Sequence, residues 1–287
     1  MLAWTTVGAG IHNPPMKIQY QDQHTTVFES ALFRTTATLI VTDDLVLLAD
    51  PNWLPAEIDY LKKKVKEVRG DKPLYLLFTH SDYDHIIGYR AFDCDGIIAS
   101  RTLAENPDKE KILQQVKAWD DHHYIRRNYP LEYPVADILI EKDGDQLVIG
   151  NTHLTFYLAP GHNYDGLFTI VEPLGIWIAG DYLSNIEFPY IYYSSYQYEE
   201  TIHKTSSILT EHSVRLLISG HGDCTQDQHE MTRRFKDALS YIRLLRDSVK
   251  TGIPFDFNRL MKQYEFPLIM QGFHEGNEQL MRKELEK

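Results

Sequence analysis

The sequence predicts an α/β fold in which two β-sheets form a sandwich with helices on the outside. Short apolar or alternating runs follow one another along the chain, helical stretches begin after the fourth run, and several later runs end in Gly-rich turns. The chain has 287 residues, of which 43% are hydrophobic. This length and composition provide a sizeable core for one large domain or two small ones.

The first half of the chain starts with strands and then alternates strands with helices. Strands are expected near residues 15–20, 25–33, 36–41 and 45–49. A helix is expected from Ala56 to Val68, with Pro55 at its start, where the missing N–H of proline is not needed. The next elements are a strand at 74–79, a short strand at 96–99 and a charged helical insert at 101–127.

The second half shows the same architecture and ends in a helical tail. Strands are expected near 137–141, 146–149, 153–159, 167–171 and 175–179. A helix at 197–211, a strand at 214–219 and a long helix at 227–250 complete this half. The tail from Phe255 to Lys287 is expected to form one or two helices, interrupted by Pro267, Gly272 and Gly276. We therefore expect one domain, residues 1–250, and a C-terminal helical extension, residues 251–287, packed on it.

The segment from His80 to His85 carries four potential metal ligands directly after the apolar run LYLLF. These ligands are His80, Asp82, Asp84 and His85. Imidazole suits zinc and iron, whereas carboxylates suit harder ions. Two ligands spaced two positions apart can point at one ion while the next pair addresses a second. Taken alone, the segment is equally compatible with a solvated loop.

Three further metal-capable residues each follow a strand-like apolar run and sit in a Gly-rich turn. They are His162 in LAPGHN, Asp181 in WIAGDY and His221 in LISGHG. Glycine allows sharp turns where side chains must crowd around an ion. One such residue is more often a packed or surface residue, but four strand–ligand–loop units in one chain indicate a shared metal site.

The motif order resembles the signature of the metallo-β-lactamase fold superfamily: HxHxDH, then PGH, GD and GHG. The resemblance runs from about residue 25 to about residue 245 and implies a four-layer αββα sandwich. Asp50, in LVLLADPNW, resembles the family's acid that orients ligands from behind them. The resemblance implies that one metal ion is held by His80, Asp82 and His162, a second by Asp84, His85 and His221, and that Asp181 bridges both.

Asp82 departs from the family pattern, because most members have a histidine there. Flavodiiron proteins have HxExDH, and the related domains of competence-associated membrane proteins have HxDxDH, so a carboxylate is compatible with a working site. The resemblance implies two divalent metal ions, with zinc as the first expectation. Manganese and iron become alternatives if Asp82 coordinates, since an additional carboxylate favours them.

The implied activity is hydrolysis of an ester, lactone, thioester or phosphodiester through a metal-bound hydroxide. Asp84 is the candidate catalytic residue, since it could take a proton from the attacking water as well as ligate. The alternative, suggested by Asp82, is a non-haem di-iron protein that reduces or senses oxygen or nitric oxide. Such chains normally carry a flavodoxin domain, for which 287 residues leave no room, so hydrolysis is favoured.

The segment 182–198 contains six tyrosines, which either line the mouth of the substrate pocket or pack as ordinary core and surface residues. These are Tyr182, Tyr190, Tyr192, Tyr193, Tyr196 and Tyr198. Ser184 stands where acyl-homoserine lactonases of the superfamily have a catalytic tyrosine, which counts against that activity. The sequence GDYLSN also differs from the GDTLF type of the glutathione-thioester hydrolases.

Composition excludes several other classes. With 29 basic and 41 acidic residues, the net charge is −12, which argues against a general nucleic-acid binder. A local basic patch around the site could be formed by Lys204, Arg215, Arg233 and Arg234, but the simpler expectation is that these residues lie on solvated helix faces. Cys94 and Cys224 form no disulfide framework, the N-terminal segment lacks a signal-peptide pattern, and no run is long enough for a membrane helix. We expect a cytoplasmic enzyme that acts on a small molecule, with no prediction of oligomeric state.

Overall fold

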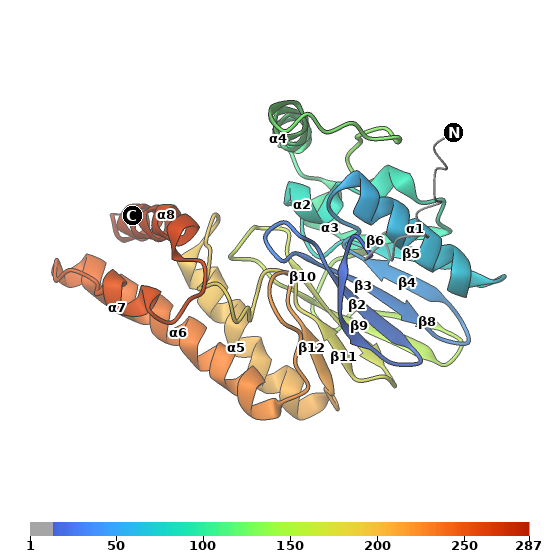
Figure 1. Cartoon of the computed structure of the whole chain (residues 1–287). Coiled ribbons are helices and arrows are strands. Elements are labelled where there is room, and N and C mark those ends of the chain that lie inside the picture. Colours follow the sequence, from blue (N-terminus) through green and yellow to red (C-terminus); the bar gives the residue numbers. More distant parts are fainter. Residues whose placement is uncertain (1–13, 287) are drawn as a thin grey trace, which may run out of the picture.

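Two β-sheets face each other and helices cover the outer side of each sheet, as Figure 1 shows. The computed structural model describes residues 14–286. Most of the N-terminal segment that lacks a signal-peptide pattern therefore lies outside the described residues. The four layers confirm the predicted αββα sandwich.

The first sheet has its strands in the order of the chain, from β1 to β7. Pairing is antiparallel from β1 to β4 and parallel from β4 to β7. The strands are β1 (Lys17–Gln21), β2 (Thr25–Glu29), β3 (Thr36–Val41), β4 (Val46–Ala49), β5 (Leu74–Leu77), β6 (Gly96–Ser100) and β7 (Ile138–Ile140).

The second sheet has the order β12-β11-β10-β9-β8, with one parallel pair between β11 and β12. Its strands are β8 (Gln146–Ile149), β9 (Thr152–Leu158), β10 (Leu167–Glu172), β11 (Ile176–Ile178) and β12 (Leu216–Ile218). The α-helices are α1 (Pro55–Arg69), α2 (Tyr83–Ile86), α3 (Arg101–Ala104), α4 (Lys109–His122), α5 (Ser195–Glu211), α6 (Gln228–Thr251), α7 (Phe257–Met261) and α8 (Pro267–Leu285).

Alternation along the strands divides the core into three layers. In β4, Val46 and Leu48 pack with the residues under α1, whereas Leu47 and Ala49 face the second sheet. On the far side of the second sheet, buried side chains of β10 and β11 pack against α5, α6 and α8. Because the central strands are buried on both faces, the apolar runs of the sequence are nearly continuous there.

Strand direction brings the candidate ligands to one edge of the sandwich. Strands β4 and β5 run parallel in the first sheet. In the second sheet β9 and β11 are both antiparallel to β10, and β12 is parallel to β11. The carboxyl ends of β9, β11 and β12 therefore lie at the same edge, and the residues that follow these strands meet there.

Two expectations about element boundaries were wrong. The strand expected at 25–33 ends at Glu29, because the chain turns at Phe33 and Arg34, which have φ of 53° and 50°. The helical insert expected at 101–127 ends at His122, and it consists of two helices because Pro107 lies in the break between α3 and α4.

The tail differs from expectation because its predicted breakers do not break it. Pro267 begins α8, where proline is favoured, and Gly272 and Gly276 lie inside that helix. Apart from the neighbouring backbone of α8 itself, no heavy atom lies within 4 Å of a Cβ built on either glycine. The local sequence favours a break at these residues, but packing of α8 against α6 stabilises the continuous helix.

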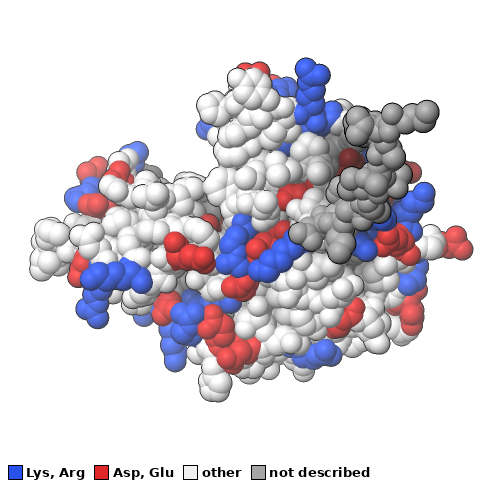
Figure 2. All heavy atoms as spheres, in the orientation of Figure 1, with Lys and Arg blue, Asp and Glu red and all other residues white. Residues whose placement is uncertain are grey.

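Charged side chains of both signs are interspersed on the face drawn in Figure 2, without a continuous basic surface there. Among the described residues, no helix is both long and apolar enough to cross a bilayer.

We propose that residues 251–287 are an extension of the 1–250 domain. Asn277, which is 2% exposed, lies on α8 and connects it to the loop after β11. Its Oδ1 accepts a hydrogen bond from the Ile191 N–H at 2.9 Å, and its Nδ2 donates to the Pro189 carbonyl at 2.6 Å and to Tyr241 Oη at 2.9 Å. One buried amide thus ties the tail to both the loop and α6.

Replacing Asn277 with alanine should lower the free energy of unfolding by about 1–3 kcal/mol, because it leaves a buried N–H and a buried carbonyl without partners. Urea denaturation followed by circular dichroism measures this change. Gln271→Ala, on an exposed side of the same helix, is the control and should change stability little. Equal stability of the two variants would contradict the proposed docking of the tail.

Candidate metal centre

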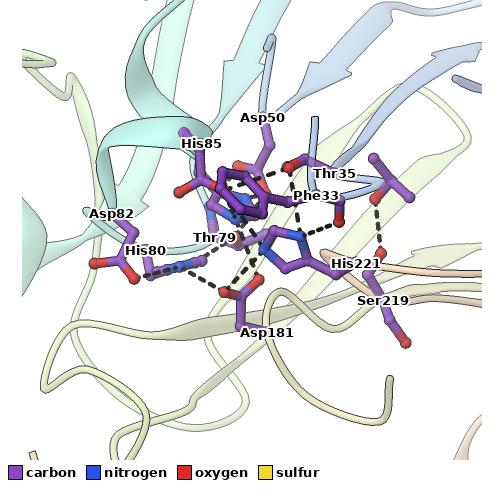
Figure 3. Close-up of polar contacts among 12 residues, drawn as sticks. Phe33, Thr35, Asp50, Thr79, His80, Asp82, His85, Asp181, Ser219 and His221 are labelled. Atoms are coloured by element: carbon purple, nitrogen blue, oxygen red, sulfur yellow. Dashed lines mark hydrogen bonds and ion pairs between the residues drawn. The ribbon is translucent and has the colours of Figure 1, made fainter. Parts of the chain in front are cut away.

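The loops that follow five strands converge on one group of polar side chains (Figure 3). Asp50 follows β4, His80 follows β5, His162 follows β9, Asp181 follows β11 and His221 follows β12. These residues are buried or nearly so. The two sheets therefore contribute to the same site, as the order of motifs predicted.

The carboxylate of Asp181 lies at the centre of this group. Its Oδ1 is 3.1 Å from His85 Nε2. Its Oδ2 is 3.3 Å from the Nε2 atoms of His162 and His221, and 3.5 Å from that of His80. One carboxylate is thus shared by four imidazoles.

The potential ligands form two groups whose donor atoms lie within 4.8 Å of one another. The first group is His80, Asp82, His162 and Asp181, and the second is Asp84, His85 and His221. The chain therefore brings all seven sequence-predicted residues together, with Asp181 reaching His85 and His221 of the second group as well.

One carboxylate oxygen of Asp82 faces the histidines of the first group, and the other accepts a hydrogen bond that fixes the side chain. Its Oδ2 lies 3.1 Å from His162 Nε2 and 3.6 Å from His80 Nε2. Asn163 Nδ2 donates a hydrogen bond of 2.7 Å to its Oδ1. The carboxylate is thus oriented so that a single oxygen points at the cluster. Asn163 was not singled out from the sequence, although it directly follows His162.

Backbone carbonyls orient two of the imidazoles. His162 Nδ1 lies 2.7 Å from the Tyr190 carbonyl, and His221 Nδ1 lies 2.9 Å from the Phe33 carbonyl. A carbonyl only accepts, so each Nδ1 must carry the proton. The neutral ring then presents the lone pair of Nε2 to the cluster, which is the arrangement that metal-binding histidines adopt.

Asp50 orients the other two imidazoles. Its Oδ2 is 2.9 Å from His85 Nδ1 and accepts a 2.6 Å hydrogen bond from Thr79 Oγ1. The same Thr79 oxygen lies 3.0 Å from His80 Nδ1 and can accept from it, since its own proton is used. All four rings are therefore fixed from behind with Nε2 facing inward.

Three of the inward-facing atoms have no hydrogen-bond partner among the described residues. They are His80 Nε2, His85 Nε2 and Asp181 Oδ1, all fully buried. The 3.1 Å contact between the last two atoms lacks hydrogen-bond geometry. Buried polar atoms without partners are unfavourable. A divalent cation coordinated by these atoms would satisfy them, so the residues present fit a metal site.

The electrostatics of the cluster favour positive charge at its centre. Burial disfavours the charged form of each group. The surrounding carboxylates nevertheless raise the pKa of His80 to about 10 and raise the pKa values of His85 and His221 well above the usual range. The imidazoles in turn hold the pKa values of Asp181 and Asp82 well below theirs. Without metal, protons occupy Nε2 of His80, His85 and His221, and divalent ions can replace them.

Gly220 allows the loops to approach this closely. A Cβ at this position would lie 2.1 Å from Asp181 Oδ1. The Gly220 carbonyl also accepts a 2.7 Å hydrogen bond from the Thr36 N–H, which connects the two sheets beside the site. Any side chain here would therefore displace the shared carboxylate.

A cavity of about 100 Å³ opens beside the centre, lined by His162 and Asp181 together with residues of the loop after β11 and of α6. Glu187 lies in its wall, and burial raises the pKa of that carboxyl to about 7. Sequence reasoning missed Glu187, although it is an isolated acid within the tyrosine-rich segment. Of the tyrosines named above, Tyr190 and Tyr198 line this cavity, so both expectations for the segment hold in part.

Arg234 corrects the expectation of solvated basic residues. It is 4% exposed and its Nε donates a 2.9 Å hydrogen bond to Glu230. Its Nη1 donates to the Leu183 and Asp223 carbonyls at 3.1 and 2.8 Å. The guanidinium thus braces the loops around the centre from within α6.

Comparison with known proteins agrees with this geometry. A family model described as the metallo-β-lactamase superfamily matches residues 31–221. The chain belongs to the metallo-β-lactamase superfamily. It is 30% identical over 217 residues to the "Probable metallo-hydrolase YqgX" of Bacillus subtilis (strain 168). The matched region covers 70% of this chain and 94% of that protein. The chain is accordingly a metal-dependent hydrolase.

Solved structures of other superfamily members share the fold at low sequence identity. The sec-alkylsulfatase Pisa1 from Pseudomonas sp. has a TM-score of 0.64 at 14% identity, and the match covers 90% of this chain and 48% of that one. A metallo-β-lactamase family protein from Thermus thermophilus has a TM-score of 0.60 at 14% identity, covering 96% and 94%. The chain spans about half the length of the alkylsulfatase.

The metal-free protein should lose stability as the pH rises from about 6.5 toward 10. A histidine whose pKa is higher in the folded than in the unfolded chain contributes its full stabilisation at pH values below its pKa in the unfolded chain. This stabilisation is lost as the pH rises through its pKa in the folded chain. The raised pKa of His80, about 10 against 6.5, sets this window. Thermal unfolding of chelator-treated protein at pH 6 and pH 9 measures the effect.

The metal-loaded protein is the control for this experiment, because its Nε2 atoms carry no proton to lose. It should show a smaller decrease in melting temperature over the same interval. A metal-free protein that is equally stable or more stable at pH 9 would contradict the charge distribution described here.

Proposed function

We propose that this member of the superfamily is a dinuclear metallohydrolase that cleaves an ester, lactone, thioester or phosphodiester bond in a small molecule. The observation that carries the proposal is the shared orientation of four imidazoles, each fixed at Nδ1 and directed with Nε2 toward Asp181. Such outer contacts are typical of metal sites.

The ligand assignment follows the two groups of side chains. His80, Asp82 and His162 would hold one ion, Asp84, His85 and His221 would hold the other, and Asp181 would bridge them. Zinc is the first choice for a site with four imidazoles. The three carboxylates keep manganese and iron as alternatives.

Two divalent ions in such a site would supply a hydroxide nucleophile near neutral pH and Lewis acidity for the substrate oxygen. The side chains of the chain position the reaction. Asp84 Oδ2 lies 3.6 Å from His85 Nε2 and 3.5 Å from His221 Nε2. These distances are short enough for Asp84 to coordinate an ion beside the two imidazoles. Asp84 is 8% exposed, so its carboxylate can also reach water and accept a proton from it. We assign it both roles.

We also infer that the protein works in the cytoplasm and does not bind nucleic acid. Cys94 and Cys224 are both free, which suits a reducing compartment. The net charge of −12 opposes phosphate contacts.

The direct test is turnover by protein reconstituted separately with zinc, manganese and iron. Chromogenic esters, a γ-lactone, a thioester and bis(4-nitrophenyl) phosphate cover the four bond types. Hydrolysis that chelation abolishes and metal restores supports the proposal. Iron with oxygen-dependent visible absorbance and no hydrolysis would support the di-iron alternative instead.

His162→Ala and Asp181→Ala should each remove bound metal and lower turnover by about 100-fold or more, since even outer contacts of metal sites contribute 10- to 100-fold. Metal content by mass spectrometry and turnover are measured on the same samples. His229→Ala, at an exposed position on α6, is the matched control and should retain metal. Full metal content in either site variant would refute the ligand assignment.

Asp82→His should shift metal preference toward zinc relative to manganese, because imidazole replaces the carboxylate that favours harder ions. Competition for equimolar zinc and manganese, read as metal content after gel filtration, measures the shift. An unchanged ratio would show that Asp82 does not coordinate.

A further inference from the structure

The cavity beside the centre is built from parts of the chain that are distant in sequence. His162 and Asp181 lie at its metal end. The loop after β11 supplies Glu187 to Tyr190, and Tyr264 follows α7. Helix α6 supplies Arg233, Arg234, Asp237 and Ala238. The cavity therefore extends from the reacting centre toward the C-terminal helices, where a substituent of a bound substrate would lie.

The arginines of the cavity wall are already paired. Arg233 forms ion pairs with Glu230 at 2.7 Å and with Asp237 at 2.6 Å. Arg234 pairs with Glu230 at 2.9 Å. Glu187, by contrast, has no hydrogen bond or ion pair to any residue in the described range 14–286. It is the one carboxyl of the wall that forms no ion pair in that part of the chain.

Aromatic rings flank this carboxyl. Phe188 lies edge-on to Tyr190 and Tyr264, with ring centroids 5.3 and 6.0 Å apart. Tyr190 is 8% exposed, and its hydroxyl is buried without a partner among the described residues. Aromatic rings, a phenol oxygen and a carboxylate together are the groups that recognise ammonium ions.

The charge of the proposed metal centre does not change this preference. Two divalent cations are balanced by the carboxylates of Asp82, Asp84 and Asp181 and one hydroxide, so the loaded centre is close to neutral. The Glu187 carboxyl, whose pKa burial raises to about 7, then has no ion-pair partner in the wall, and a cation bound beside it would favour its ionised form. The ionised carboxylate would repel an anionic substituent and attract a cationic one.

We propose that this cavity is a subsite for an ammonium group of the substrate and that Glu187 is its specificity-determining residue. The inference rests on the proposed hydrolysis and narrows its substrate class to compounds with a cationic substituent. A volume of about 100 Å³ accommodates a small ammonium head group rather than a large cofactor.

The test compares two isosteric substrates. The 4-nitrophenyl esters of 4-(trimethylammonio)butyrate and 5,5-dimethylhexanoate differ by a permanent positive charge and cannot differ in metal coordination. With the metal-loaded protein we expect kcat/KM to be about tenfold higher for the charged ester. Glu187→Gln should bring the ratio of the two values to about 1.

Glu200→Gln, on an exposed side of α5, is the matched control and should keep the wild-type ratio. Because Glu187 has no partner in the described structure, its exchange removes no internal hydrogen bond, and circular dichroism confirms the fold. A wild-type ratio near 1, or a ratio that survives in Glu187→Gln, overturns the inference.

A binding measurement separates this inference from the proposed function. Calorimetric titration of the metal-loaded protein with tetramethylammonium chloride needs no turnover. Binding that Glu187→Gln weakens about tenfold supports the subsite even if neither ester is hydrolysed, in which case ester hydrolysis alone is rejected. Absent or unaltered binding overturns the subsite regardless of hydrolysis.

Discussion

The position of one carboxylate constrains the rest of the structure. Asp181 lies 3.1–3.5 Å from four imidazole nitrogens that arrive on three other loops. Packing these groups together buries charges that water would otherwise solvate, and burial is tolerated only if opposite charge is present. The raised pKa values of His80, His85 and His221 and the lowered pKa of Asp181 express the same requirement. The loops of the fold therefore converge on a site that favours bound cations.

The site also lies at the seam between the two sheets. Thr36, at the start of β3, donates through its N–H and its Oγ1 to the carbonyls of Gly220 and Ser219, at 2.7 and 2.6 Å. His221 Nδ1 donates a hydrogen bond of 2.9 Å to the Phe33 carbonyl, in the loop between β2 and β3 of the first sheet. Groups of the first sheet thus hold both the backbone that precedes His221 and its imidazole. Ion binding at this seam would join the sheets, so metal affinity and stability of the sandwich are linked.

Much of the fold and of the candidate site could be predicted from sequence because both depend on local patterns. Apolar runs that end in Gly and one ligand identify strands, their ends and the residues that meet there. Glu187 was out of reach for this reasoning, because its significance depends on Tyr264, which lies 77 positions further along the chain. Gly272 and Gly276 misled it, because tertiary packing holds α8 together at residues that are unfavourable in isolation.

The candidate ligands lie in the part of the chain shared with the superfamily, whereas part of the cavity wall comes from the helical region that follows it. All seven candidate ligands fall within residues 31–221, the range of the family match. The far wall of the cavity, at Asp237 and Tyr264, comes from beyond that range. Substitutions in α6 and after α7 can therefore reshape the cavity without touching a ligand. Since the proposed hydroxide chemistry needs only the ligands, this separation would allow substrate choice to vary while the reaction is kept.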